Sequence, residues 1–433
     1  MKGTDLHVQQ VLNEQIRAVY PPNSVLETLY SKAEECMNTI DAALRKKNIH
    51  AEVFLGGSLA KGTIIKQDVY DIDIFVRFFE QGKKSFSDIL ASVLGSRYKR
   101  LHGSRDYFQN RIGNIFIEVI PVLKIAAPRD AQNVTDLSYF HVNYVLDKIK
   151  KNDSLKQEIV LAKTFCHAQH CYGAESYING FSGYALELLL CHYGSFLNLL
   201  KAVSLVENEQ KIIIDDSHFY KDEQDMYREL NISKQQSPII LIDPTYRERN
   251  ALAGLSMETF LRFQTAARAF LKNSSTHFFT EVAVADQFKK SKTVKIVAVK
   301  TDKQAGDIAG TKSKKFFGFM HTELQKELVV NKSDFAYDET KNQALFYFSI
   351  MGQKKDELVK GPALTYPKHV KQFKKAHPGA IVKNGAVYAP VKHTLSFEKW
   401  FNEFTKNYKK IIREMGVRKI EIADEKKLKK GKR

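Results

Sequence analysis

Two short segments near the start of the chain contain residues suited to phosphate chemistry. The segment Phe54–Thr63 holds two adjacent glycines and a serine, and the segment Tyr70–Phe75 holds Asp71 and Asp73. Side chains of a strand alternate between its two faces, so the two aspartates are expected on one face. Neighbouring carboxylates repel each other unless a cation lies between them, and their oxygens suit hard divalent cations. The pair therefore predicts a metal site, although an Asp-x-Asp pattern by itself more often marks a solvent-exposed strand edge.

The glycine-serine turn would complete such a site. Without side chains at Gly56 and Gly57, backbone N–H groups can approach a triphosphate closely, and the Ser58 hydroxyl adds a donor. Lys61 and Thr63 follow in the sequence and extend the same phosphate-binding turn. Two metals beside a bound triphosphate can activate an attacking hydroxyl and stabilise a leaving pyrophosphate. The two segments together predict a two-metal transfer reaction at a triphosphate.

A third carboxylate is expected on a neighbouring strand. Glu118 is the one acidic residue in the apolar run 115–121. A half-buried strand can carry a single outward-facing acid that has no chemical role. The aspartate pair nearby favours a metal-binding or catalytic role for Glu118 instead.

Strands and helices must position these side chains. Strands are expected at 51–57, 69–78 and 114–125, with Pro121 near the end of the last one. Helices are expected at 5–48, with a break at Pro21-Pro22, and at 86–94. This interleaving predicts an α/β or α+β domain over residues 1–145.

The pattern changes twice after this domain. Further helices are expected at 155–170, 183–200 and 256–272, the last with Ser256 as its N-cap. After the boundary signal at 273–276, strands are expected at 293–299, 343–351 and 380–391, and a closing helix at 396–415. The sequence therefore predicts an α+β multidomain protein with three parts: 1–145, a helical central domain at 146–272, and a β-rich C-terminal region at 273–433.

Positive charge is concentrated in the C-terminal region. The 433 residues include 67 Lys and Arg against 49 Asp and Glu, a net charge of +18. Residues 273–433 hold 34 basic and 17 acidic residues, whereas residues 1–272 hold 33 and 32. Such a region favours a polyanionic partner, while a solvated lysine-rich tail is the alternative, above all for the run 426–433.

Other classes of protein and site are disfavoured. No uncharged apolar run of about 18 residues is present and the N-terminus lacks a secretory apolar core, so no membrane contact is expected. Four cysteines do not make a disulfide framework in a chain of this length, and a cytoplasmic protein is expected. The Cys166–Cys171 segment has cysteines and histidines at its ends, but on a helix its two i,i+4 pairs would be about 100° apart, so zinc is not predicted.

The segments described above, taken in their order and spacing, resemble the archaeal-type (class I) CCA-adding enzymes. These are tRNA nucleotidyltransferases of the polymerase-β-like superfamily. The resemblance runs almost from end to end, through 57–63, 71–75, 171–175, 180–189, Asp243, Arg249-Asn250, 360–363, 369–377 and 383–388. It implies a polymerase-β-like nucleotidyltransferase head at 1–145, a helical neck at 146–272 and a basic, tRNA-binding body and tail at 273–433.

The resemblance also implies roles for individual residues. Asp71, Asp73 and Glu118 would be the catalytic, metal-binding carboxylates, holding Mg²⁺ in a two-metal site. The nucleotide (ATP or CTP) would be bound by Ser58, Lys61, His141, Lys163, Tyr172 and Arg249. Two of these positions depart from the family pattern, because Lys61 stands where arginine is usual and Glu118 where aspartate is common.

Four of the nucleotide-binding residues that the resemblance implies could also have a purely structural role. His141 lies among aromatic residues and could be a packed histidine, and Lys163 could be a solvated helix residue. Tyr172 could be an ordinary core aromatic residue. Arg249 belongs to the charged segment 247–249, where a surface ion pair is the default.

The implied function is an enzymatic one. It is the template-independent addition or repair of the 3′-terminal CCA of tRNA from CTP and ATP, with release of pyrophosphate. The partners would be the 3′ end and the acceptor or top half of tRNA, and the oligomeric state, including a homodimer, stays open. The alternatives are a poly(A)-polymerase-like RNA nucleotidyltransferase and a non-catalytic RNA-binding protein on the same scaffold; the presence of all three carboxylates disfavours the latter.

Overall fold

The structure is a computed structural model that describes residues 2–79, 85–103, 105–207, 210–291, 293–303, 305–391, 393 and 395–423. The chain divides into two compact units, Met1–Ala174 with Ile178–Glu281, and Glu175–Tyr177 with Val282–Arg433. Both units combine helices with sheets, which confirms the α+β multidomain class. The finer division into head, neck and basic region stays a prediction, and the run 426–433 lies outside the described residues.

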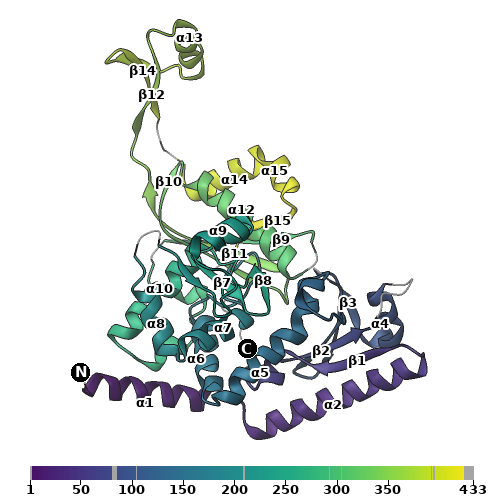
Figure 1. Cartoon of the computed structure of the whole chain (residues 1–433). Helices are drawn as coiled ribbons and strands as arrows, with labels where there is room; N and C mark the ends of the chain where they lie inside the picture. The colour runs from purple at the N-terminus through teal and green to yellow at the C-terminus, as the bar shows by residue number, and fades with distance from the viewer. Residues whose placement is uncertain are drawn as a thin grey trace. The chain divides into compact units, whose positions relative to one another are not determined.

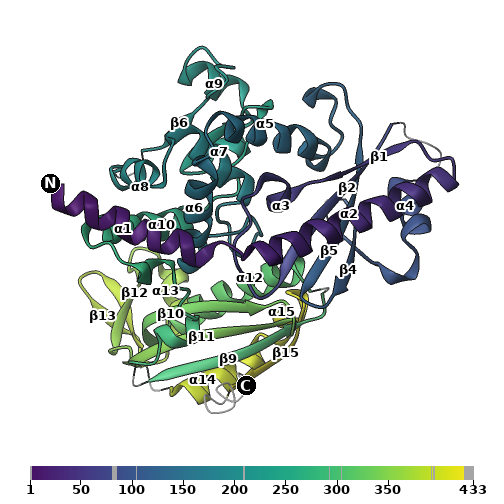
Figure 2. The same ribbon diagram turned by 90° about the horizontal axis from the view of Figure 1, so that it is seen from below.

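The first unit contains a five-stranded mixed sheet with the order β1-β2-β5-β4-β3. Its strands are β1 (Ala51–Leu55), β2 (Tyr70–Phe78), β3 (Lys99–Leu101), β4 (Tyr107–Ile112) and β5 (Ile115–Leu123). The helices α2 (Asn23–Lys46) and α4 (Phe86–Leu94) cover one face, and Figure 2 shows α2 lying along the sheet. Ile72, Ile74 and Val76 of β2 point into the core on this face. The alternate residues of β2, Asp71 and Asp73, therefore point to the opposite face.

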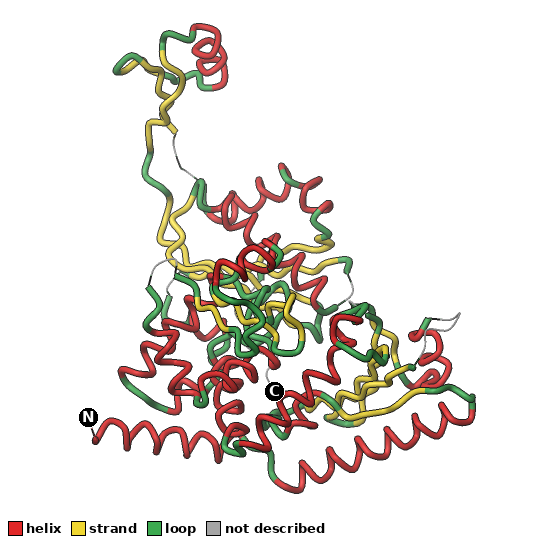
Figure 3. The backbone as a smooth tube through the Cα atoms, in the orientation of Figure 1, coloured by secondary structure: helices red, strands yellow, loops and turns green. Residues whose placement is uncertain are grey.

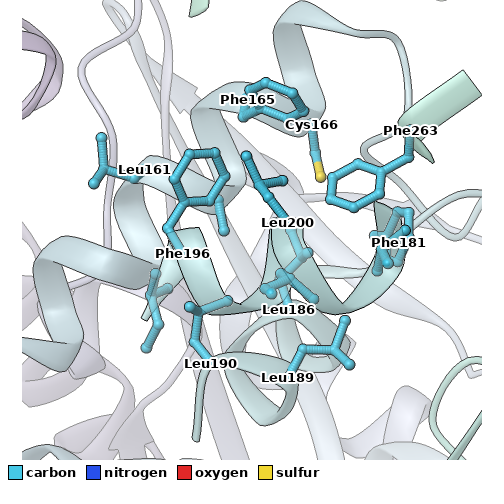
Figure 4. Packing of buried hydrophobic residues seen from close by; sticks show 14 of the residues in the cluster. Leu161, Phe165, Cys166, Phe181, Leu186, Leu189, Leu190, Phe196, Leu200 and Phe263 are labelled. Carbon is cyan, nitrogen blue, oxygen red and sulfur yellow. The ribbon is translucent and has the colours of Figure 1, made fainter. Parts of the chain in front are cut away.

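A second hydrophobic core in the same unit is built mainly from helices. They are α1 (Lys2–Val19), α5 (Ser138–Lys151), α6 (Leu155–Ala168), α7 (Gly183–Tyr193), α8 (Phe196–Ser204) and α10 (Met257–Lys272). Figure 4 shows aromatic and aliphatic side chains from α6, α7, α8 and α10 filling its centre. A short sheet, β6 (Ile212–Ile214), β7 (Ile239–Asp243) and β8 (Tyr246–Asn250), flanked by α9 (Glu223–Glu229), completes this part.

One helix prediction in this region is wrong in its extent. The stretch 183–200 forms two helices, because Gly194 adopts a left-handed conformation with φ 73° after α7. Ser195 then caps α8 by accepting a hydrogen bond from the Asn198 N–H. The predicted cap at Ser256 is confirmed, since its side chain accepts a hydrogen bond from the Thr259 N–H.

The second unit contains two sheets. The four-stranded sheet has the order β10-β11-β9-β15 and is antiparallel throughout. Its strands are β9 (Val294–Thr301), β10 (Leu328–Asp338), β11 (Gln343–Gln353) and β15 (Val417–Ile422), and the helices α12 (Asp307–Leu324), α14 (Phe397–Asn407) and α15 (Lys409–Glu414) pack with it. The three-stranded sheet comprises β12 (Glu357–Ala363), β13 (Ile381–Lys383) and β14 (Ala386–Val391) and carries α13 (Pro367–Ala376) (Figures 1 and 3).

Two predictions in the second unit are also corrected. The single strand expected at 380–391 is a hairpin, because Asn384 and Gly385 both have positive φ and form a two-residue turn. The closing helix expected at 396–415 is interrupted at Tyr408 and forms α14 and α15. No helix in the described part of the chain combines the length and hydrophobicity of a membrane span.

Candidate active site

Three carboxylates lie on one face of the two central strands of the first sheet. The parallel register of β2 and β5 pairs Asp73 directly with Glu118. The neighbours of Glu118 on β5, Ile117 and Val119, point into the core, so Glu118 points to the same face as Asp73. The structure thus brings together the two carboxylate segments that the sequence singled out.

The electrostatics of this face favour a cation. Burial removes water from Asp71, and the neighbouring Asp73 repels its negative charge. Together these effects raise the pKa of Asp71 to about 6. Burial raises the pKa of Asp73 as well, although the charges of Lys61 and Lys163 oppose this shift. Both shifts mean that the nearby positive charges do not fully offset the cost of burying the ionised carboxylates. Carboxylate oxygens are the ligand type that hard divalent cations prefer, but within the described ranges no three His, Cys, Asp or Glu side chains, these included, form a group that could hold a metal ion.

The glycine-serine turn forms the short helix α3 (Gly57–Lys61) beside the carboxylates. Gly57 has a φ of 61°, and a Cβ atom at this position would lie 1.8 Å from Asp73 Oδ2. The Gly56 N–H donates to the Asp73 carbonyl oxygen at 2.8 Å. Ser58 follows in the first turn of α3, where helical N–H groups have no acceptor within the helix. Glycine at position 57 is therefore required so that the glycine-serine turn can lie against Asp73.

Replacing Gly57 with alanine is expected to lower nucleotide transfer by about 10²-fold, because the new methyl group would displace the Asp73 carboxylate. Gly62→Ala is the matched control at the other end of α3. Gly62 has a φ of 66°, but its Cβ would only touch Lys156 at 3.5 Å. Backbone strain should lower the free energy of unfolding of both variants by a similar amount, roughly 1–2 kcal/mol, while only Gly57→Ala should lose activity. Equal activity of the two variants in a transfer assay would contradict this role of Gly57.

Two lysines share one buried carboxylate next to this turn. Lys61 Nζ donates to Glu187 Oε2 at 2.5 Å, and Lys163 Nζ donates to Glu187 Oε1 at 2.8 Å. The Thr63 hydroxyl donates to Glu187 Oε1 at 3.1 Å and lies 2.9 Å from Lys163 Nζ. Glu187 is fully buried, and both lysines are at least 90% buried. The plainer alternative for Lys163, a solvated helix residue, is wrong.

Burial of the lysine cluster has opposite effects on its members. Burial alone would raise the pKa of Glu187, but the charges and hydrogen bonds of Lys163 and Lys61 lower it to about 2. Burial lowers the pKa of Lys163, and Glu187 only partly offsets this. Two cations share one anion, so the cluster keeps an excess positive charge beside Asp73. That excess suits the phosphates of a nucleotide.

Tyr172 lies close to Lys163. A Cβ atom on Gly183, the first residue of α7, would be 2.8 Å from the Tyr172 hydroxyl and 3.8 Å from Lys163 Cε. The ring of His167 stacks on Tyr172 with 3.8 Å between centroids. The tyrosine is therefore held on one side while its hydroxyl faces the start of α7 near the lysine.

His141 and Arg249 meet at another buried carboxylate, Asp243. Arg249 Nη1 lies 2.6 Å from Asp243 Oδ2, and His141 Nε2 lies 3.0 Å from the same oxygen. The His141 ring also stacks on Tyr184 with 4.0 Å between centroids. Burial lowers the pKa of His141, although Asp243 opposes that shift. Arg249 thus forms an ion pair with a buried aspartate at the end of β7, and not with a surface residue of the segment 247–249.

Sequence reasoning missed Glu187, Asp243 and Tyr184 as site residues. Glu187 had a readable signal, because it is the one acid among the apolar residues 185–190 of a helix. A buried acid on such a helix requires cationic partners. Asp243 precedes Pro244 at a strand end, which in the sequence looks like an ordinary turn.

Known proteins match this chain in sequence. Residues 157–280 match the family described as tRNA nucleotidyltransferase, second domain. A CCA-adding enzyme of Nanoarchaeum equitans is 39% identical over 249 residues, which are 57% of this chain and 62% of that protein. A CCA-adding enzyme of Methanocaldococcus jannaschii is 32% identical over 290 residues, 64% of this chain and 63% of that protein. Over these stretches the chain is similar in sequence to archaeal CCA-adding enzymes.

The match to the archaeal CCA-adding enzymes has a defined extent. The two alignments span less than two thirds of each relative's own length. The family-matched segment 157–280 includes Lys163, Tyr172, Glu187, Asp243 and Arg249, whereas the carboxylate strands lie before it. Among solved structures, the RNA terminal uridylyl transferase Cid1 aligns with a TM-score of 0.49 and 11% identity over 64% of this chain and 98% of Cid1.

Proposed function

We propose that this protein is an enzyme that adds or repairs the 3′-terminal CCA of tRNA. It would transfer CMP twice and AMP once, from CTP and ATP, to the tRNA 3′ end without a template, and would release pyrophosphate. One observation carries this proposal: the five residues of α3 contact Asp73 through Gly57 and Glu187 through Lys61. The carboxylates that would hold metal and the lysines that would bind phosphate therefore adjoin one helical turn, which supports a shared role in transfer.

Each group of residues would have a distinct task. Asp71, Asp73 and Glu118 would hold Mg²⁺, which supplies Lewis-acid activation of the primer hydroxyl and of the α-phosphate. Ser58, Lys61, Lys163 and Tyr172 would bind the triphosphate and aim its leaving pyrophosphate. His141 and Arg249 would contact the nucleotide farther from the phosphates.

A nucleotide-selectivity assay tests the proposal. The protein is incubated with tRNA ending at the discriminator base and with each labelled nucleoside triphosphate separately, then with CTP and ATP together. Addition of C without ATP, followed by a stop after a single A, supports CCA addition. Indefinite addition of A would establish a poly(A)-polymerase-like activity instead, and absence of transfer with any nucleotide would leave RNA binding as the function.

Divalent metal is expected to stabilise the protein in a pH-dependent way. The pKa of Asp71 lies above its ordinary value, so ionised Asp71 destabilises the metal-free fold as the pH rises through about 6. A bound cation removes this penalty. About 10 mM Mg²⁺ should therefore raise the Tm more at pH 8 than at pH 5, and the increment should shrink in Asp71→Asn. A Tm increment that is the same at both pH values would argue against metal at Asp71.

The basic C-terminal region would hold the tRNA through its phosphates. Helix α13 carries Lys368, Lys371, Lys374 and Lys375 and has no buried residue, which suits contact with a polyanion. If six phosphates are neutralised, affinity for tRNA should fall by about 10³-fold between 50 and 200 mM salt. Filter binding over that range measures the slope, and a flat response would contradict the phosphate contacts.

A further inference from the structure

The carboxylate of Asp243 is shared between two sets of partners, one on each oxygen. Oδ1 accepts hydrogen bonds from the Tyr184 hydroxyl at 3.0 Å, the Thr245 N–H at 2.9 Å and the Thr245 hydroxyl at 2.8 Å. Oδ2 lies 2.6 Å from Arg249 Nη1 and 3.0 Å from His141 Nε2. The side chain of Asp243 is fully buried. One oxygen therefore fixes the carboxylate to the fold, and the other faces two side chains proposed to bind the nucleotide.

This division of partners makes Asp243 rigid. A backbone N–H and two hydroxyl groups hold Oδ1, so the carboxylate cannot rotate without breaking all three hydrogen bonds. Burial alone would raise the pKa of Asp243, but His141, Arg249 and the Thr245 N–H hold it well below its ordinary value. These partners favour the ionised carboxylate, which is the form that pairs with Arg249.

A fixed carboxylate gives Arg249 a fixed orientation. The guanidinium is planar and rigid, so committing Nη1 to Asp243 sets the direction of the remaining N–H donors. The Arg249 side chain is 22% exposed, and its guanidinium lies 5.6 Å from the Tyr184 ring centroid. Tyr184 is stacked by His141 and anchored to the same carboxylate. Arg249 therefore holds its remaining donors in a fixed framework, and part of its side chain is accessible to solvent.

We infer that Asp243 is a specificity-determining positioning residue, which orients Arg249 so that the site accepts C and A and rejects U and G. This inference rests on the proposed function. Cytosine and adenine share one pattern on their pairing edge, a ring-nitrogen acceptor beside an exocyclic amino group. Uracil and guanine present a ring N–H beside a carbonyl oxygen instead. A fixed guanidinium donor pairs with the ring nitrogen of the first two bases and opposes the N–H of the others.

The test separates base recognition from phosphate binding. Asp243→Asn keeps the shape of the side chain but removes the charge that holds Arg249. In equilibrium binding, CTP should lose at least tenfold in affinity, while inorganic tripolyphosphate, which has no base, should bind as it does to the unmodified protein. In transfer to tRNA, incorporation of UMP relative to CMP should rise by at least tenfold, with the loss for CTP mainly in KM rather than kcat.

Two further variants keep the test decisive. Glu229→Gln removes the carboxylate partner of the neighbouring Arg247 and leaves every partner of Asp243 in place, so the C-to-U ratio should stay within about threefold of the unmodified protein. Asp243→Glu retains the buried charge, which protects folding, and displaces Arg249 by one methylene, so the C-to-U ratio should fall here too. A purely structural role would lower the Tm and slow all four nucleotides equally.

The outcomes distinguish this inference from the proposed function. The inference is overturned, and the proposed function stands, if the unmodified protein adds C and A while both Asp243→Asn and Asp243→Glu behave like it. Behaving like it means that the variants keep its C-to-U ratio and its affinity for CTP relative to tripolyphosphate. Unmodified protein that transfers no nucleotide defeats the proposed function. In that case, equal affinities of the unmodified protein for CTP and UTP overturn the inference as well.

Discussion

Replacement of Asp73 by asparagine is expected to slow nucleotide transfer by about 10³-fold or more, which corresponds to roughly 4 kcal/mol of transition-state stabilisation. The side chain keeps its shape but loses the charge that faces Glu118 across the central strands. The variant should fold, and its Tm should not fall, because ionised Asp73 is buried beside Asp71 without full compensation. Single-turnover transfer of CMP to tRNA measures the effect.

The control for Asp73→Asn is Asp106→Asn in the same sheet region. Asp106 pairs with Arg100 and with His102 at the β3–β4 end, where the Asp106 side chain is 19% exposed. This variant loses a carboxylate and two ion pairs but should retain full activity. If Asp73→Asn transferred CMP as fast as Asp106→Asn does, the assignment of β2 and β5 as the catalytic face would be wrong.

Replacement of Glu187 by glutamine is expected to have the largest combined effect on stability and substrate binding. Removing one partner of a buried ion pair costs about 3–5 kcal/mol, and here two lysines lose their shared partner. In a unit of this size the Tm should fall by roughly 6–12 °C. The lost charge also lowers the pKa of Lys163 further, because Glu187 was raising it. The KM for CTP should therefore increase from pH 6 to pH 8.5 more steeply than in the unmodified protein.

Glu158→Gln serves as the matched control for Glu187→Gln. Glu158 Oε2 accepts a hydrogen bond from the Phe196 N–H at 2.7 Å within the same helical core. The same substitution there should lower the Tm without changing how the KM depends on pH. A pH profile of Glu187→Gln that superimposes on that of Glu158→Gln would show that Glu187 does not maintain the charge of the lysines.

The positions of the carboxylates could be predicted from the sequence because they follow from local geometry. Alternation along β2 places Asp71 and Asp73 on one face, and an acid in an apolar strand stands out as Glu118 does. Helix α4 was predicted at its observed bounds, and in the structure Ser85 caps its start and Gly95 follows its end. Predictions failed where one or two residues with positive φ divide an element, as at Gly194 and at Asn384-Gly385.

The buried polar partners could not be predicted in the same way. Glu187 and Lys61 are 126 residues apart, and Arg249 and His141 meet only because β7 ends beside α5 and α7. Spacing along the chain contains no information about such long-range pairs. A residue type can indicate that a partner is needed, as for the acid in α7, but the tertiary fold determines which partner it finds.

The lysine cluster also has a consequence for how the first unit unfolds. Lys61 and Thr63 follow the strand β1 beside the sheet core, whereas Lys163 and Glu187 lie on helices of the second core. Their hydrogen bonds join these two hydrophobic cores, which Tyr139 of α5 also links by packing on Phe54 of β1. Apolar contacts alone would allow the two cores to shift relative to each other. Directional hydrogen bonds to the shared Glu187 carboxylate hold them in one relative position. The groups that would bind the triphosphate thus also couple the two cores into one cooperative folding unit, and a bound nucleotide would strengthen that cooperativity.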